Sequence, residues 1–401
     1  MLSSEVLSLI DQVNSGAKAC QDENQNRDAQ AELLATCRKL TAELESPFEA
    51  IRRFSFQPYE TLALRIAVQL NLLDAIKDED VTALGLATTT GADRLLIVRI
   101  MRVLCTMGVF TEKGVELYGA GRIASALRAR PSLRDNVTTL FDFGLNAAAK
   151  LPSFLEQTSF ANPTRDGSGL WQHAFNTPLD FWAWLEEDPE RARAFHSSMV
   201  DRRHASADAA WFTKYPVVAN LCSTVPPASA EVLLVDVGGG WGQDLLAFAS
   251  AHPSVPGRLI LQDQAHALAE ADRESLGRRR VEPIAHDFFD PQPVIGARAY
   301  YFHHIFHDWP DAECRTILKQ TVAAMLPGGR SRLLIVEDVL PDTGVSSYLG
   351  LRDMHMMTLF GSMERNRGQW TELLGQEGLE VVKIWELGPN SENLIEAVLR
   401  Q

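Results

Sequence analysis

The sequence predicts an α/β chain, in which a helical N-terminal part with a winged helix precedes a doubly wound parallel sheet. Two observations lead to this fold class. Up to about residue 215 the chain reads as helices and loops, interrupted by one short alternating stretch. From Glu231 onward short apolar runs alternate with helical stretches, which is the pattern of βαβ units with helices on both faces of a parallel sheet.

The composition is that of an ordinary globular protein. The 401 residues are 46% hydrophobic and 22% charged, enough for two or three domains. The formal net charge of −14 argues against nucleic acid or an anionic membrane as the main partner, because phosphate binding needs clustered positive charge. The five cysteines are scattered without a CxxC pair. With no basic secretory leader and no apolar run of spanning length, we expect a cytoplasmic protein with reduced thiols.

We expect three regions along the chain. Residues 1–125 form a helical and winged-helix region, 126–215 a helical connecting region, and 216–401 the sheet. The connecting region is rich in aromatic residues, most of which we expect in the core. A few of them could instead line a pocket for a flat organic molecule.

The winged helix follows from local signals. Residues 60–76 form an amphipathic helix, and Thr82 and Asp93 can each cap a further helix. The alternating stretch 109–120 carries Lys113-Gly114 at its middle, which predicts a hairpin turning there. Three helices followed by a hairpin give a winged helix.

Winged helices often bind DNA, so that function is an alternative. Arg94, Arg99 and Arg102 lie on the third helix, but apolar residues are interleaved with them and the chain is acidic. These features favour subunit packing over a DNA-binding regulator.

The glycine turn after the first strand of the sheet region indicates a ligand. Gly238, Gly239, Gly240 and Gly242 crowd this turn, where glycine lets the backbone turn sharply or approach a ligand. A dinucleotide fingerprint needs glycine at 243, which is Gln243, and no Gly-Lys-Ser/Thr of a P-loop follows. The turn therefore suits a nucleoside without phosphates.

Two acidic residues extend this site. Asp263 ends the next strand, at the spacing where a carboxylate accepts both hydroxyls of a ribose. Asp287 ends a third strand and could accept from an adenine amino group, with Phe288 packing on the ring. Any single aspartate could instead be a helix cap, but the ordered set outlines an adenosine site.

These motifs resemble a known family. The segments "LLVDVGGGWG", "LQD", "HDFFD", "HDWPD", "LLIVEDVLPD" and "DMHMM…ERNRGQW" are similar to those of S-adenosylmethionine-dependent O-methyltransferases of the plant caffeate/flavonoid type and their fungal relatives. The resemblance is strongest over about 230–385. It implies a Rossmann-like catalytic domain, S-adenosylmethionine as cofactor, a small-molecule hydroxyl acceptor, and a homodimer formed through the N-terminal region.

His307 is the predicted general base. It follows a predicted strand on the ligand-binding edge, and a histidine with a pKa near 6.5 is largely a free base at neutral pH. By resemblance, Glu337 and Glu364 match the two glutamates that flank the base, and Trp309 matches a tryptophan near the cofactor. The alternatives are a helix-capping histidine, or a metal ligand together with His303. No nearby cysteine or glutamate completes a metal site, so we expect none.

The chain departs from the family at two places. Relatives usually carry a basic residue at the position of His303, where it contacts the cofactor, and Thr-Glu where this chain has Asn366 and Arg367. The acceptor pocket is also inferred from the resemblance, with core packing as the alternative for each of its residues: Phe195, Met199, Met356 and Phe360.

Two functions remain open on these grounds. The first is methyl transfer to a phenolic or enolic hydroxyl of a secondary metabolite. The second is the chemistry of a pericyclase group of this fold, which binds the same cofactor and directs dehydration, Diels–Alder or ene reactions. The presence of His307, Glu337 and Glu364 favours methyl transfer, because a protein that transfers nothing need not keep the base.

Overall fold

The computed structural model describes residues 2–21, 26–164, 169–205, 210–222, 231–388 and 392–400. The chain forms two compact units, Met1–Phe141 and Asp142–Gln401. Each unit has its own apolar core. The three-part division expected from the sequence stays a prediction.

Unit 1 contains the winged helix. The helices and strands of the whole unit are α1 (Ser4–Ala19), α2 (Asn26–Leu44), α3 (Pro47–Gln69), α4 (Leu72–Ala75), β1 (Val81–Thr82), α5 (Ala83–Thr90), α6 (Arg94–Thr106), β2 (Phe110–Gly114), β3 (Leu117–Ala120), α7 (Arg122–Ala129) and α8 (Pro131–Thr139). The predicted caps are confirmed: the side chain of Thr82 accepts from the N–H of Gly85, and that of Asp93 from the N–H of Leu96. The three small strands pair in the order β1-β3-β2.

Two local predictions in unit 1 need correction. The helix expected at 60–76 begins at Pro47, where Ser46 and Glu49 form a capping box. It ends at Gln69, because Asn71 takes a left-handed conformation and starts α4. The hairpin turns at Val115–Glu116 and not at Lys113-Gly114, which lies in β2 beside an irregular register.

Unit 2 is built on a seven-stranded sheet in the order β11-β12-β8-β7-β4-β5-β6. The strands are β4 (Val232–Val237), β5 (Arg258–Asp263), β6 (Val281–Ala285), β7 (Ala299–His303), β8 (Arg332–Glu337), β11 (Leu379–Glu386) and β12 (Asn393–Leu399). The five strands from β6 to β8 run parallel. The last strand, β12, runs antiparallel to both of its neighbours, so the sheet is mixed and not wholly parallel as expected.

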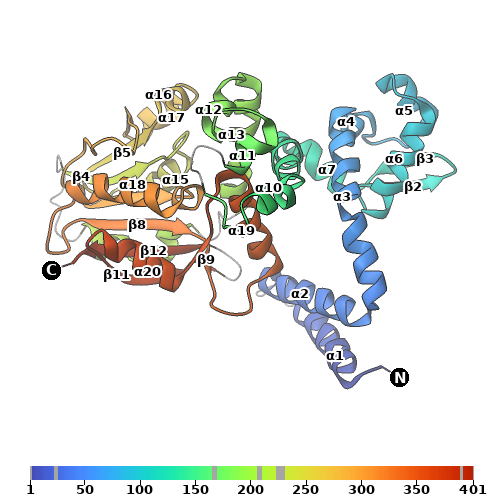
Figure 1. The fold of residues 1–401 in the computed structure, drawn as a ribbon, viewed down its shortest axis with the longest axis horizontal. Coiled ribbons are helices and arrows are strands. Elements are labelled where there is room, and N and C mark those ends of the chain that lie inside the picture. Colours follow the sequence, from blue (N-terminus) through green and yellow to red (C-terminus); the bar gives the residue numbers. More distant parts are fainter. Residues whose placement is uncertain are drawn as a thin grey trace. The chain divides into compact units, whose positions relative to one another are not determined.

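Helices cover both faces of this sheet (Figure 1). One face packs against α14 (Trp211–Lys214), α15 (Gln243–Ala251) and α17 (Arg273–Arg278). The other packs against α18 (Asp311–Ala324) and α20 (Arg367–Gln376). The central strands are therefore buried on both sides, which explains why they read as continuous apolar runs.

A helical layer accompanies the sheet in unit 2. Its helices are α9 (Asn146–Ala148), α10 (Leu151–Gln157), α11 (Leu170–Phe175), α12 (Phe181–Glu186), α13 (Pro189–Ala205) and α19 (Ser347–Phe360). The short helix α16 (Ala265–Ala269) instead packs on the sheet through Leu268, with α14, α15 and α17. Two short strands, β9 (Val339–Leu340) and β10 (Arg365–Asn366), pair with each other. Among the helices that the structure describes, none combines the length and apolar character that a membrane span requires.

Candidate active site at the carboxyl ends of the sheet strands

The glycine turn links β4 to α15 and is tightly packed. Gly238, Gly240 and Gly242 have φ values of 72°, 60° and 86°, a region that residues with a Cβ avoid. A Cβ added to Gly239 would lie 2.5 Å from Cδ1 of Leu261, and one added to Gly238 would meet a side chain at 2.6 Å. The turn therefore presents bare backbone, which fits close approach by a nucleoside.

The two predicted acids lie at the same sheet edge as this turn, because β4, β5 and β6 are neighbours. The Asp263 carboxylate accepts hydrogen bonds from the backbone N–H groups of Gly240 and Gln264, both at 2.7 Å. The Asp287 carboxylate accepts from the N–H of Phe289 at 3.0 Å. The structure thus brings the predicted adenosine residues together. Their contact with a ribose or an adenine stays a prediction.

A row of aromatic rings connects two of the predicted cofactor residues, Phe288 and Trp309, to the predicted acceptor residue Phe360. The ring of Trp309 meets Phe288 edge-on, with centroids 5.9 Å apart. The ring of Trp182, on α12, lies nearly parallel to Trp309 at 6.4 Å and to Phe360 at 5.5 Å. Trp182 was not among the predicted site residues, because nothing in "FWAW" separates a pocket wall from core. Such flat surfaces suit a planar molecule.

The predicted acceptor residues belong to one apolar cluster. Phe195, Met356 and Phe360 are buried in it, and the partly buried Met199 packs against it. The structure therefore brings all four together, from α13 and α19. Whether they contact an acceptor or only form core stays a prediction.

His307 lies buried in a short turn, Phe306–Asp308, at the carboxyl end of β7. Its Nδ1 is 2.8 Å from Oε1 of Glu364 but 3.7 Å from Oε2 of Glu337. The other oxygen of Glu337 accepts the backbone N–H groups of Phe306 and His307, at 2.9 and 3.3 Å. Glu364 is thus a closer partner of Nδ1 than Nη2 of Arg352, which lies at 3.3 Å, and Glu337 holds the turn that carries the imidazole.

Two further histidines follow one another at the end of β7. Nδ1 of His303 is 2.5 Å from Asp244, and its Nε2 is 3.1 Å from Glu392. Burial disfavours the imidazolium of His303, but Asp244 and then Glu392 outweigh burial and raise its pKa to about 9. Both ring nitrogens of His303 thus face carboxylates within the chain. A contact between His303 and the cofactor stays a prediction.

His304 has a left-handed backbone conformation, with φ at 52°. Its Nε2 is 2.7 Å from the Glu392 carboxylate, and its Nδ1 is 2.9 Å from Nη2 of Arg352. Burial lowers the pKa of His304 well below its usual range, and the charges of Arg352 and His303 act in the same direction. An arginine can only donate, so the neutral ring accepts at Nδ1 and donates to Glu392 from Nε2–H.

The histidines and glutamates form two groups with metal-like spacing. One consists of His303, His304 and Glu392, and the other of His304, His307 and Glu337. The reasoning that no glutamate lies near enough was therefore wrong, because strand pairing brings Glu337 and Glu392 close. The charge of Arg352, however, lies beside Nδ1 of both His304 and His307. Because the Arg352 guanidinium lies at these Nδ1 atoms and Nε2 of His304 carries a proton, the two groups do not offer the set of lone pairs that a metal ion needs.

The charge around His307 changes its acidity. Burial disfavours its imidazolium, but the carboxylates of Glu337 and Glu364 outweigh burial and raise the pKa of His307. Burial raises the pKa of Glu337 to about 7. The expectation of an ordinary pKa for His307 is therefore corrected: the ring becomes a free base at a higher pH than an exposed histidine.

The loop after α19 explains one departure from the family motif. Asn366 caps α20: its side chain accepts from the backbone N–H of Gln369, whose own side chain accepts the N–H of Asn366. Arg365 is buried and donates to the carbonyl oxygens of Phe306 and Trp309, at 2.9 Å each. Asn366 thus caps a helix, next to a residue that binds the turn carrying His307. For Arg367 the structure offers no explanation beyond its place as the first residue of α20.

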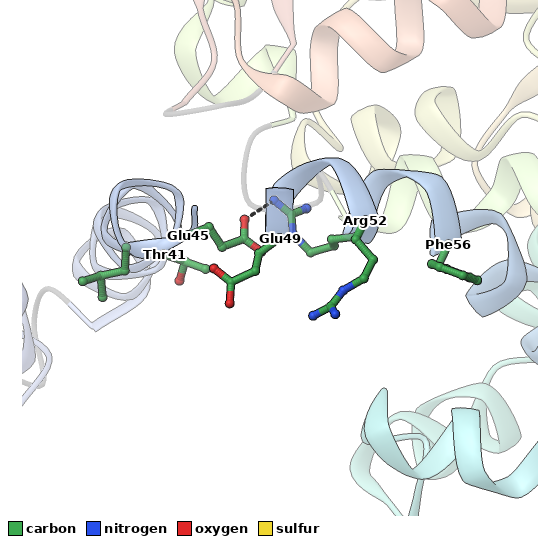
Figure 2. A pocket seen from close by; sticks show the side chains of 7 residues that line it. Thr41, Glu45, Glu49, Arg52 and Phe56 are labelled. Atoms are coloured by element: carbon green, nitrogen blue, oxygen red, sulfur yellow. Dashed lines mark hydrogen bonds and ion pairs between the residues drawn. The ribbon is translucent and has the colours of Figure 1, made fainter. Parts of the chain in front are cut away.

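A hollow in unit 1 has a different character (Figure 2). It measures about 520 Å³ and is lined by Thr41, Leu44, Glu45, Glu49, Arg52, Arg53 and Phe56 at the bend between α2 and α3. Nearly all of these residues are exposed. Its charged groups pair with neighbours, Arg53 with Glu45 and Glu49 with Ser46. It is a surface hollow without a catalytic set of residues.

Comparison with known proteins identifies the family. The model of the O-methyltransferase domain matches residues 158–380, and that of the O-methyltransferase dimerisation domain matches 54–130. Demethylsterigmatocystin 6-O-methyltransferase of Aspergillus flavus is 32% identical over 91% of this chain and 92% of its own length. The chain belongs to the O-methyltransferase family. It is thus a methyltransferase of the plant and fungal type, with S-adenosylmethionine as its cofactor.

Solved structures agree with this family. LepI in complex with S-adenosylmethionine superposes with a TM-score of 0.88 and 27% identity, over 99% of this chain and all of LepI. A structure described as a pericyclic reaction enzyme superposes with a TM-score of 0.86 and 26% identity, over 99% and 100% of the two chains. This methyltransferase therefore shares its fold with a structure described by a pericyclic reaction, while its relative from Aspergillus flavus is described as an O-methyltransferase. Its dimerisation domain supports formation of a homodimer.

Proposed function

We propose that this methyltransferase transfers a methyl group to a phenolic or enolic hydroxyl of a secondary metabolite, with His307 as general base. The observation that carries the proposal is the 2.8 Å contact between Nδ1 of His307 and the Glu364 carboxylate. A proton held on Nδ1 leaves the lone pair of Nε2 for the acceptor hydroxyl, and the Asp308 carboxylate lies 3.4 Å from that nitrogen.

The cofactor supplies a methyl group on a positively charged sulfur. The glycine turn, Asp263 and Asp287 would hold its adenosine part, and the rings of Trp309 and Phe288 would exclude water beside it. Nε2 of His307 would take the proton of the acceptor hydroxyl, so that this oxygen can accept the methyl group that the cofactor would supply, with the electron pair of the carbon–sulfur bond remaining on sulfur. Glu364 stabilises the imidazolium that forms.

The test is methyl transfer to a panel of phenols and enolised polyketide-like acceptors, followed by mass spectrometry with isotope-labelled cofactor. His307→Asn should lower kcat by roughly 10²- to 10⁴-fold, the usual contribution of a general base. Binding of the demethylated cofactor product should change little. Transfer at the wild-type rate in His307→Asn would overturn the base assignment.

A second function is supported by one comparison, the likeness to the pericyclic reaction enzyme. In that case the cofactor would bind without donating its methyl group. The same panel separates the two functions. Tight cofactor binding with no methylated product, but with dehydrated or cyclised product, would favour pericyclic chemistry.

A further inference from the structure

A buried arginine lies between two of the three histidines. Arg352, on α19, is 7% exposed, and its Nη2 is 2.9 Å from Nδ1 of His304 and 3.3 Å from Nδ1 of His307. Its Nε is 2.9 Å from Oε1 of Glu364, and its Nη1 pairs with the Asp338 carboxylate. Nη2 therefore faces both imidazole rings, Nη1 pairs with Asp338, and Nε lies at ion-pair distance from Glu364 without a hydrogen bond to it.

The groups that face His307 come from four elements. Glu337 ends β8, Glu364 follows α19, Asp308 lies in the same turn as His307, and the ring of His304 stacks on it with centroids 4.9 Å apart. Three of these four groups are carboxylic acids. Arg352 is the one guanidinium that contacts the imidazole within the described residues.

We propose that Arg352 is a positioning residue that keeps the Nδ1–H of His307 oriented toward Glu364 and offsets the negative charge around that ring. This inference rests on the proposed role of His307 as base. Nε of Arg352 lies 2.9 Å from Oε1 of Glu364, the same oxygen that lies 2.8 Å from Nδ1 of His307, so the charge of Arg352 holds the carboxylate oxygen that accepts the Nδ1–H hydrogen bond. A guanidinium near Nδ1 also disfavours the imidazolium, as like charges do at this range.

Arg352 also holds His304 in place. His304 has a left-handed backbone, which costs about 1 kcal/mol or more for a non-glycine residue, so its side chain needs firm partners. Arg352 donates to Nδ1 of this ring, while Nε2–H donates to Glu392. His304 therefore stays neutral and stacks on His307 without adding a charge.

Lysine could not replace this arginine in full. A single ammonium carries the same charge, but it cannot reach two imidazoles and two carboxylates with separate nitrogens. The charge and the geometry of Arg352 can therefore be tested separately, with Arg352→Gln removing the charge and Arg352→Lys keeping it.

The experiment is an NMR titration of the full chain with ¹⁵N-labelled histidine, saturated with the demethylated cofactor product. The His307→Gln spectrum identifies the His307 signals. In the wild type the neutral ring should carry its proton on Nδ1. Arg352→Gln should raise the pH midpoint of His307 by about one unit or more, as loss of a neighbouring like charge does. Arg352→Lys should restore the midpoint but leave a mixture of both tautomers.

The pH dependence of kcat gives a second test of the role of Arg352. In Arg352→Gln the acid limb of the pH–kcat profile should move up by the same amount, so the rate recovers at high pH. A purely structural residue would instead lower the rate at every pH. Arg332→Met is the matched control: it removes the pair that Arg332 forms with Glu396 on β12, and it should leave the titration of His307 unchanged.

An unchanged or lowered midpoint of His307 in Arg352→Gln would overturn the proposal. If that variant does not fold, Arg352→Lys is the deciding variant. His307 tautomer populations in Arg352→Lys that equal those of the wild type would contradict the geometric role of Arg352. Failure of the base assignment gives a different result. His307→Asn would then keep full methyl transfer, whatever the NMR titrations show.

Discussion

At the level of single residues, the two glutamates beside the base have different tasks. Glu364 contacts Nδ1 of His307 at 2.8 Å, whereas Glu337 accepts backbone N–H groups of the turn that carries His307. The family resemblance places both beside the base without separating their roles. Removal of the Glu364 charge should therefore act on the chemistry, and removal of Glu337 on the local fold.

Glu364→Gln should lower kcat on the order of 10²-fold or more, because an amide no longer stabilises the imidazolium and permits the wrong tautomer. Its melting temperature should change less than that of Glu337→Gln, which weakens the anchor of the turn. Steady-state kinetics and thermal unfolding of both variants check this. Equal losses of kcat with equal losses of melting temperature would contradict the division of roles.

The pH dependence of catalysis follows from the raised pKa of His307. Only the neutral ring can accept a proton, so kcat should rise with pH through a midpoint above about 6.5, the ordinary value. A pH–rate profile with a saturating acceptor measures this midpoint. A profile that is flat from pH 6 to 9 would argue against a histidine base in this environment.

The pH dependence of stability follows from His303. Its pKa in the folded chain is about 9, above the value near 6.5 of an unfolded histidine. The contribution of His303 to the free energy of unfolding is therefore fully present below pH 6.5, and it is lost as the pH rises through 9. The raised pKa values of His307 and Glu337 act in the same direction.

The free energy of unfolding should thus fall between pH 6.5 and 9.5, and urea denaturation at a series of pH values measures it. His303→Gln should show a shallower fall over that interval. The same slope in His303→Gln as in the wild type would contradict the contribution of His303.

At the level of elements, the glycine turn is set by its contact with β5. Gly238 and Gly239 donate their backbone N–H groups to the carbonyl oxygen of Gln262, at 2.8 and 3.1 Å. A Cβ on Gly239 would lie 2.5 Å from Leu261 and 2.6 Å from the buried Asp236. Glycine is thus required here by close packing against the neighbouring strand, in addition to the close approach of a ligand.

Gly239→Ala should destabilise unit 2 by about 1–3 kcal/mol, the usual cost of overpacking, and weaken cofactor binding. Thermal unfolding and calorimetric titration with the demethylated cofactor product measure both effects. Gly277→Ala is the matched control, because that glycine lies in α17 with nothing within 4 Å of an added Cβ. It should leave binding unchanged and not reduce stability.

At the level of the whole molecule, unit 1 carries apolar residues that its own core does not cover. Phe54 on α3 and Leu95 on α6 are 59% and 61% exposed, and both lie in the matched dimerisation domain. Large exposed apolar side chains of this kind are typical of a subunit interface. They agree with a homodimer formed through this region.

Leu95→Glu should weaken that dimer, because it places a charge in an apolar interface. Light scattering coupled to size-exclusion chromatography should give twice the chain mass of 44.4 kDa for the wild type and a shift toward the single-chain mass for the variant. Val382→Glu, at a 51% exposed position on β11, is the control and should stay dimeric. A wild type of single-chain mass would contradict the expected dimer.

The sequence by itself determined the features that depend on neighbours along the chain. The caps at Thr82 and Asp93, the glycine turn, and Asp263 and Asp287 at strand ends all follow from local patterns, and the structure has them in place. Local patterns failed where the chain departs from regular periodicity, as at Asn71 and Glu116, whose positive φ values move a helix end and a hairpin turn.

The tertiary structure alone decided the surroundings of the base. His304, Arg352 and Glu392 lie in a strand end, a helix and the start of the last strand, and no motif links them. They meet because β12 returns antiparallel beside β8 and brings Glu392 to the sheet edge where His304 lies. Burial there lowers the pKa of His304, whereas nearby carboxylates outweigh burial and raise the pKa of His303 and His307. Desolvation and charges within a few ångströms depend on packing and not on sequence distance.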